Sequence, residues 1–138
     1  MPDNNDYYIT YGFGYARYLH NSNSIVQNLT VFVPNEDRIK VNILNLKNTL
    51  PRKRTLKLVY YIKPVLGEDE IKSNEYINLE FNENSNMILA KNLANSDFDD
   101  ICYVSSSEKI NSYTGDKKFF IGKGHLGNPE RFKCYRTK

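Results

Sequence analysis

The side chains best suited to acid–base chemistry are carboxylates in two clusters. Glu80 and Glu83 form one, and Asp97, Asp99 and Asp100 form the other. A pair of carboxylates flanking a glycosidic bond is the usual means of cleaving it, one of them acting as the general acid. Both clusters lie in stretches rich in Asn and Ser, where acidic side chains are usually solvated. We therefore interpret both carboxylate clusters as solvated loop residues and assign no catalytic residue.

The other reactive side chains are isolated from suitable partners. Residues 105–107 are three consecutive serines, but neither His20 nor His125 stands in a context typical of a Ser/His/Asp triad. Two histidines with Cys102 and Cys134 do not have the spacing of a closed zinc site. Cys102 follows an isoleucine in an apolar run and is predicted to be a small core side chain. We predict neither a metal nor a cofactor.

Two short motifs have features of phosphate-binding loops. The Gly-x-Gly of residues 12–14 lacks the strand–turn–helix context of a nucleotide site, so glycines at a strand start, where backbones approach closely, are the better interpretation. The basic run at 51–54 is interpreted as a solvated turn rather than a phosphate-binding patch. The net charge of +3 is spread in blocks, with nine basic against four acidic residues in 1–66 and two against nine in 67–100. We therefore expect no nucleic-acid partner.

Tyrosine is the unusual component of the composition. The chain has eleven Tyr and seven Phe but no Trp, and five of the tyrosines fall between residues 7 and 18. Tyrosines on a sheet stack on sugar rings and hydrogen-bond to sugar hydroxyls. Tyr15, Arg17 and Tyr18 are the candidate carbohydrate contacts. The alternative, in which these tyrosines line a sandwich core or an interdomain face, stays open.

The elements that would position these residues are predicted to be strands. Apolar and polar residues alternate with a period of two, and turn residues separate the runs, which predicts antiparallel hairpins and an all-β sandwich. The long runs are 25–33, 39–47 and 54–63, and the shorter ones are 13–19, 76–81, 87–91, 101–105 and 117–121. A change of phase within 39–47 suggests a bulge or burial on both sides. Residues predicted to be buried between two sheets are Leu29, Val31, Leu56, Leu58 and Tyr60.

The chain of 138 residues has the length of a single domain. We expect core strands over 10–121 and a C-terminal connecting loop over 122–138, without a strand to close the sheet, which suggests part of a larger sandwich. The sequence contains no apolar run long enough to span a bilayer and no secretory signal. We therefore expect a cytoplasmic protein with no membrane partner, in which the thiols stay reduced.

A series of motifs, in order along the chain, resembles one enzyme family. The series comprises residues 12–18, 27–34, 46–49, 51–52, 56–61, 65–67, 104–108, 120–124 and 128–129. Together these motifs are similar to the N-terminal β-sandwich region of glycoside hydrolase family 94, formerly glycosyltransferase family 36. The residues of these motifs are most similar to those of the group of cyclic β-1,2-glucan synthases and cellobiose phosphorylases. The resemblance covers about residues 10–132, with departures at Leu19, where the family pattern has an acidic residue, and at Asn28, where it has Glu.

The resemblance implies a supersandwich of the galactose-mutarotase-like type and a noncatalytic role. In the family, inverting phosphorolysis takes place in an (α/α)6 barrel that holds the general acid and the phosphate-binding residues, so none of these is carried onto this chain. The implied partners are a downstream catalytic barrel of a parent protein and a second copy of the chain, with an oligosaccharide as a further possibility. The alternative interpretation is a stand-alone carbohydrate-binding β-sandwich.

Overall fold

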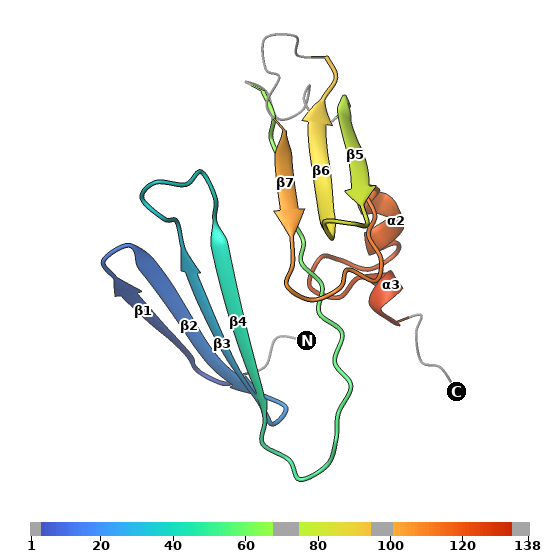
Figure 1. Cartoon of the computed structure of the whole chain (residues 1–138). Coiled ribbons are helices and arrows are strands. Elements are labelled where there is room, and N and C mark those ends of the chain that lie inside the picture. Colours follow the sequence, from blue (N-terminus) through green and yellow to red (C-terminus); the bar gives the residue numbers. More distant parts are fainter. Residues whose placement is uncertain (1–3, 68–74, 95–100, 134–138) are drawn as a thin grey trace. The chain divides into compact units, whose positions relative to one another are not determined.

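The computed structural model of the chain describes residues 4–67, 75–94 and 101–133. Its strands form two antiparallel sheets, one with the order β1-β2-β3-β4 and one with the order β5-β6-β7 (Figure 1). The chain divides into two compact units, Met1–Leu58 and Val59–Lys138, and each unit holds one sheet. The predicted all-β class with antiparallel pairing is confirmed.

The four-stranded sheet is a meander whose strands follow one another in space as they do in sequence. Its strands are β1 (Tyr7–Gly12), β2 (Tyr15–Ser22), β3 (Ile25–Phe32) and β4 (Val41–Asn48). The β2–β3 turn has positive φ at both Asn23 (51°) and Ser24 (61°), as a type I′ hairpin requires. The β1–β2 turn has Gly14 at a φ of 85°, where a glycine is favoured.

Because directly opposed residues share a face, the strand register divides this sheet into two faces. The Tyr8 face carries Tyr8, Thr10, Gly12, Tyr15, Arg17, Leu19, Asn21, Val26, Asn28, Thr30, Phe32, Val41, Ile43, Asn45 and Lys47. The Tyr7 face carries Tyr7, Ile9, Tyr11, Ala16, Tyr18, His20, Ser22, Ile25, Gln27, Leu29, Val31, Asn42, Leu44, Leu46 and Asn48. The Tyr7 face is the more apolar of the two along β1 and β4.

The phase change in the third predicted strand does not produce a bulge. The ladder between β3 and β4 runs without interruption from Phe32–Val41 to Ile25–Asn48. Ile43 and Leu44 therefore lie on opposite faces, 46% and 42% exposed. Neither alternative, a bulge or burial on both sides, is found: the ladder is uninterrupted, and both side chains are exposed.

The three-stranded sheet has one apolar and one mostly polar face. It consists of β5 (Ile77–Asn82), β6 (Met87–Asn92) and β7 (Cys102–Ser105). The apolar face carries Ile77, Leu79, Phe81, Ile88, Ala90, Cys102 and Val104, together with the buried Asn92 opposite Ile77. The segment that follows β7 passes over this face, since the Tyr113 ring lies 5.3 Å from that of Phe81 and a Cβ on Gly115 would meet Leu79. Cys102 lies on this face but is only half-buried, whereas the sequence predicted a core side chain.

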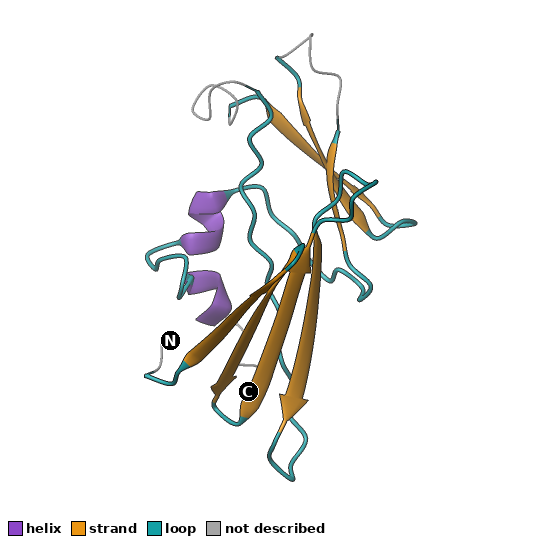
Figure 2. Cartoon of the chain, turned by 90° about the vertical axis from the view of Figure 1, so that its left-hand side faces the viewer, coloured by secondary structure: helices purple, strands orange, loops and turns teal. Residues whose placement is uncertain are grey.

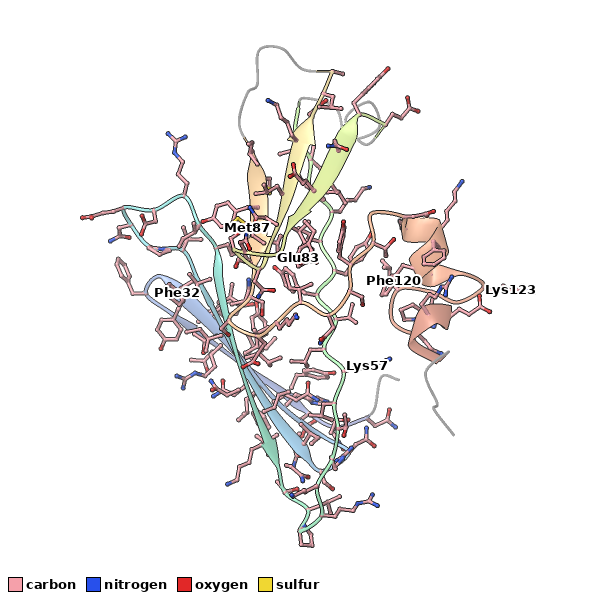
Figure 3. The ribbon with its side chains drawn as sticks, turned by 45° about the vertical axis from the view of Figure 1, so that its right-hand side comes forward. Phe32, Lys57, Glu83, Met87, Phe120 and Lys123 are labelled. Carbon is pink, nitrogen blue, oxygen red and sulfur yellow. The ribbon has the colours of Figure 1, made fainter. Side chains whose placement is uncertain are left out.

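The segment 54–63, predicted to be a strand, forms none (Figure 1). Leu56, Leu58 and Tyr60 are 44%, 63% and 60% exposed, and Leu29 and Val31 on β3 are half-buried, so the predicted core was wrong. The physical reason is that alternation supplies only the preference for an extended backbone. A strand also needs a neighbour for its N–H and C=O groups, and no described strand pairs with this segment. Lys57, labelled in Figure 3, lies on it.

The segment 117–121, also predicted to be a strand, is the short helix α2 (Lys117–Ile121) (Figure 2). The Asp116 carboxylate caps its start by accepting the Phe119 N–H at 2.9 Å, and Gly122 ends it with a φ of 57°. These end signals outweigh the β preference of the two phenylalanines, so the strand prediction was wrong. Phe120 of α2 lies with its ring centroid 6.4 Å from that of Tyr61 (Figure 3).

The segment predicted to be a C-terminal loop contains a second helix, α3 (Glu130–Lys133). Its Glu130 carboxylate accepts the backbone N–H of Lys123 at 2.9 Å. The Arg131 guanidinium lies 3.6 Å from the centre of the Phe119 ring. The two helices and their turn therefore form a folded hairpin.

Candidate functional site

The candidate carbohydrate contacts all lie on β2, but not on one face of the sheet. Tyr15 and Arg17 are exposed on the Tyr8 face, where Arg17 is opposed by Thr10 and Thr30. Tyr18 is half-buried on the Tyr7 face. The structure therefore brings Tyr15 and Arg17 together and separates Tyr18 from them. A role for these side chains in binding carbohydrate stays a prediction.

The Gly-x-Gly motif has a packing role next to this pair. Gly12 is opposed by Tyr15, and a Cβ on Gly12 would collide with the Tyr15 ring. The glycine thus leaves room for the aromatic ring to lie across the strand, as tyrosines do opposite glycines in sheets. The interpretation from the sequence, glycines at a strand start where backbones approach closely, was wrong: Gly12 ends β1, Gly14 lies in the turn, and the group close to Gly12 is a side chain.

A hollow with a volume of about 480 Å³ opens on the same face of the sheet, toward the start of β1. It is lined by Asn5, Asp6, Tyr8, Leu19, His20, Asn21 and Val26. Sequence reasoning included Tyr8 among the clustered tyrosines but missed Asp6 and Asn21. The available signal was the register: the tight turn at residues 23–24 places Asn21 opposite Val26, and the turn at 13–14 places Tyr8 opposite Leu19.

His20 has a structural role at the edge of this hollow. It is only 6% exposed, and its ring stacks on that of Tyr7 with centroids 3.8 Å apart and planes 1° from parallel. With Nδ1 protonated, it donates to the backbone oxygen of Asp6 at 3.2 Å. These contacts hold the residues before β1 against β2.

Both departures from the resemblance fall at one place in the sheet. Leu19 on β2 and Asn28 on β3 are directly opposed on the Tyr8 face. Among the described residues, the buried Asn28 Oδ1 has no hydrogen-bond partner. The two positions at which the resemblance implies acidic residues therefore form a single cross-strand pair, here without charge.

The carboxylates and serines singled out from the sequence form no catalytic arrangement in the part of the chain described. Glu80 is exposed on β5, and Glu83 is exposed in the loop after it (Figure 3). The Ser105 hydroxyl donates to the backbone oxygen of Asn86 at 3.2 Å, and that of Ser106 accepts the Glu108 N–H at 3.1 Å. Asp97, Asp99, Asp100 and Cys134 lie outside the described residues.

The basic run at 51–54 is an exposed turn. The Arg54 guanidinium donates to the backbone oxygen of Asn23, and the Asn48 amide donates to that of Arg52 at 2.7 Å. Backbone contacts of this kind fit the turn interpretation.

No group of three or more His, Cys, Asp or Glu side chains within 4–67, 75–94 and 101–133 is placed to hold a metal ion. In the same ranges, no helix is long and apolar enough to cross a membrane.

Comparison with known proteins supplies the family. Searches of the curated proteins and of the solved structures returned no match. A family model described as "Glycosyl hydrolase 94, supersandwich domain" matches residues 1–137, nearly the whole chain, and two antiparallel sheets agree with such a domain. The chain belongs to the family of glycosyl hydrolase 94 supersandwich domains.

Proposed function

We propose that this chain is a noncatalytic β-sandwich module of a larger protein, either a carbohydrate phosphorylase or a relative of the cyclic β-1,2-glucan synthases. The module supports a catalytic (α/α)6 barrel and takes part in subunit contacts. Membership of the supersandwich family supports the module role. The barrel and the identity of the enzyme rest on the resemblance of the motifs.

The observation that carries this proposal is the exposure of large apolar side chains in both units. In the unit Val59–Lys138, Tyr76, Leu93 and Phe119 are 51%, 68% and 51% exposed. A larger protein that packs against such side chains removes them from water.

Much of the uncovered surface in the first unit is apolar. On the Tyr7 face, Tyr7, Ile9 and Tyr11 are 61%, 50% and 75% exposed. Leu44 adds to the same face from β4, the other edge of the sheet. Contiguous apolar surface of this kind marks an interaction site. β1 and β4 also each have one edge that no described strand covers, which is a template for pairing with another chain.

A phosphorolysis assay tests the noncatalytic part of the proposal. The purified chain is incubated with inorganic phosphate and either cellobiose or β-1,2-gluco-oligosaccharides. We expect no release of glucose 1-phosphate above the blank, because inverting phosphorolysis needs a positioned acid and an anion site. Release that scales with the concentration of the chain would contradict the proposal.

A further inference from the structure

The basic run formed by Arg52, Lys53 and Arg54 has no part in the module role. It lies in a stretch in which every residue from 51 to 63 is exposed and none belongs to a strand or a helix. The boundary between the two compact units, after Leu58, lies in the same stretch. Proteases cut exposed connections of this kind in preference to regular elements. The chain therefore offers three adjacent cleavage points to an enzyme that recognises basic side chains.

Two hydrogen bonds hold the residues on either side of Lys53. The backbone oxygen of Arg52 accepts the Asn48 amide at 2.7 Å, and the Arg54 guanidinium donates to the backbone oxygen of Asn23. Within the described ranges, neither the backbone oxygen nor the ammonium group of Lys53 makes a hydrogen bond or an ion pair. A serine protease places both groups of the residue before the scissile bond, the side chain in its S1 pocket and the carbonyl oxygen in its oxyanion hole. The bond after Lys53 is therefore the most accessible of the three.

The chain has one other pair of adjacent basic residues, Lys117 and Lys118. Both are also exposed, but they lie in α2, where the backbone oxygen of Lys118 accepts the Gly122 N–H at 2.8 Å. A peptide that binds in extended form needs its backbone groups free for the partner, so this pair is cut only after the helix opens. The two basic sites are therefore alike in exposure and differ in backbone conformation.

We propose that the basic run is a processing site for a trypsin-like serine endoprotease, whose S1 pocket holds a carboxylate. The protease adds water across the bond between Lys53 and Arg54. The carbonyl carbon of Lys53 becomes a carboxylate, and the nitrogen of Arg54 leaves as an amine. Three adjacent positive charges attract such an acidic pocket more strongly than the single charge of Lys57 does.

The cut divides the chain between its two sheets. It yields residues 1–53 and 54–138, and it breaks no strand pair of the two described sheets, because these pairs lie within 7–48 and 77–105. Each fragment therefore keeps one whole sheet. The proposal does not rest on a role in a larger enzyme.

Limited digestion of the full chain with trypsin, followed by intact mass spectrometry, tests the proposal. The first products should be the fragments 1–53 and 54–138. Lys53→Gln should slow the loss of intact chain at least fivefold. Lys57→Gln in the same exposed stretch and Lys118→Gln in α2 are the matched controls, and each should change the rate less than twofold. The cut chain should keep the far-UV circular dichroism of the intact chain.

Three results would overturn the proposal: a first cut at any bond other than Lys53–Arg54, equal effects of Lys53→Gln and Lys57→Gln, or loss of the β-sheet spectrum on cutting. The three substitutions replace exposed side chains, so each variant should fold as the unaltered chain does. Failure here leaves the module role standing, because the phosphorolysis assay and the association state do not involve the basic run.

Discussion

Asn86 ties the β5–β6 hairpin to the chain that follows β7. It has a φ of 50°, a conformation that Asn tolerates better than most residues. Its amide nitrogen donates to the backbone oxygens of Ser106 at 2.7 Å and Glu108 at 2.8 Å. Its amide oxygen accepts the Ile110 N–H at 2.8 Å. One side chain therefore orients the segment that leads over the apolar face of the second sheet.

Removing the two donors at this position should destabilise the chain. Asn86→Asp keeps the acceptor for Ile110 but loses both donated bonds, and Asn86→Gly keeps the backbone conformation but loses all three bonds. We expect each to lower the free energy of unfolding by about 1–2 kcal/mol in urea denaturation. The same substitutions at Asn84, an exposed residue of the same loop, serve as controls. Equal effects at the two positions would show that the Asn86 bonds contribute nothing.

Asn28 is a polar residue in an unfavourable place. Its buried Oδ1 has no partner among the described residues, and Asn is a poor strand former. Asn28→Val should therefore raise the free energy of unfolding by about 1 kcal/mol, because a valine has no polar group to desolvate. Asn45→Val is the control, since Asn45 is the exposed cross-strand partner of Asn28 on the same face. A gain no larger than that of Asn45→Val would mean that the unpaired oxygen is not costly.

At the scale of elements, the sequence predicted strands well where a tight turn joins two runs of alternating residues. The residues at 21–24 and 82–86 have the turn chemistry that fixes the register of the β2–β3 and β5–β6 hairpins. Strand prediction failed where a pairing strand or a helix cap, and not the alternation of residues, determines the local structure. The segment 54–63 alternates as clearly as β3 but has no described partner, and Asp116 begins a helix in a segment rich in phenylalanine.

The candidate site was only partly predictable for a related reason. The sequence shows that tyrosines cluster near the N-terminus. Which of them share a face of the sheet depends on the register of β1 against β2. This register separates Tyr18 from Tyr15 and places Tyr8 beside Leu19. The polar residues of the hollow, Asp6 and Asn21, come together only through contacts made outside the strands.

Burial gives a direct prediction for these elements. Ile25 on β3 is 6% exposed, whereas Leu58 in the extended segment is 63% exposed. Ile25→Ala should cost about 2–4 kcal/mol of unfolding free energy, since lost burial and a residual cavity add. Leu58→Ala should cost less than about 0.5 kcal/mol, as surface substitutions do. Urea denaturation of both variants at one protein concentration checks this. A larger loss of unfolding free energy for Leu58→Ala than for Ile25→Ala would support the core predicted from the sequence.

For the whole molecule, the main feature is how little of its apolar surface is covered. Among the described residues, Ile25 and Ala90 are the only buried hydrophobic side chains. The core of each unit is small, since even a domain of about 60 residues ordinarily buries roughly 60% of the surface that its unfolded chain exposes. We infer that the units depend on a partner for part of their burial, and in the isolated chain that partner is a second copy, because a symmetric dimer covers the same surface on both molecules.

Sedimentation equilibrium of the isolated chain tests this claim most directly. We expect a dimer or larger assembly at micromolar concentration, with Leu44→Lys, on the Tyr7 face, weakening association at least tenfold. Ile43→Lys should leave association unchanged, because Ile43 is the adjacent residue, equally exposed, on the opposite face. A single species with the monomer mass of 16.1 kDa across a wide concentration range, or equal weakening by the two variants, would contradict the account.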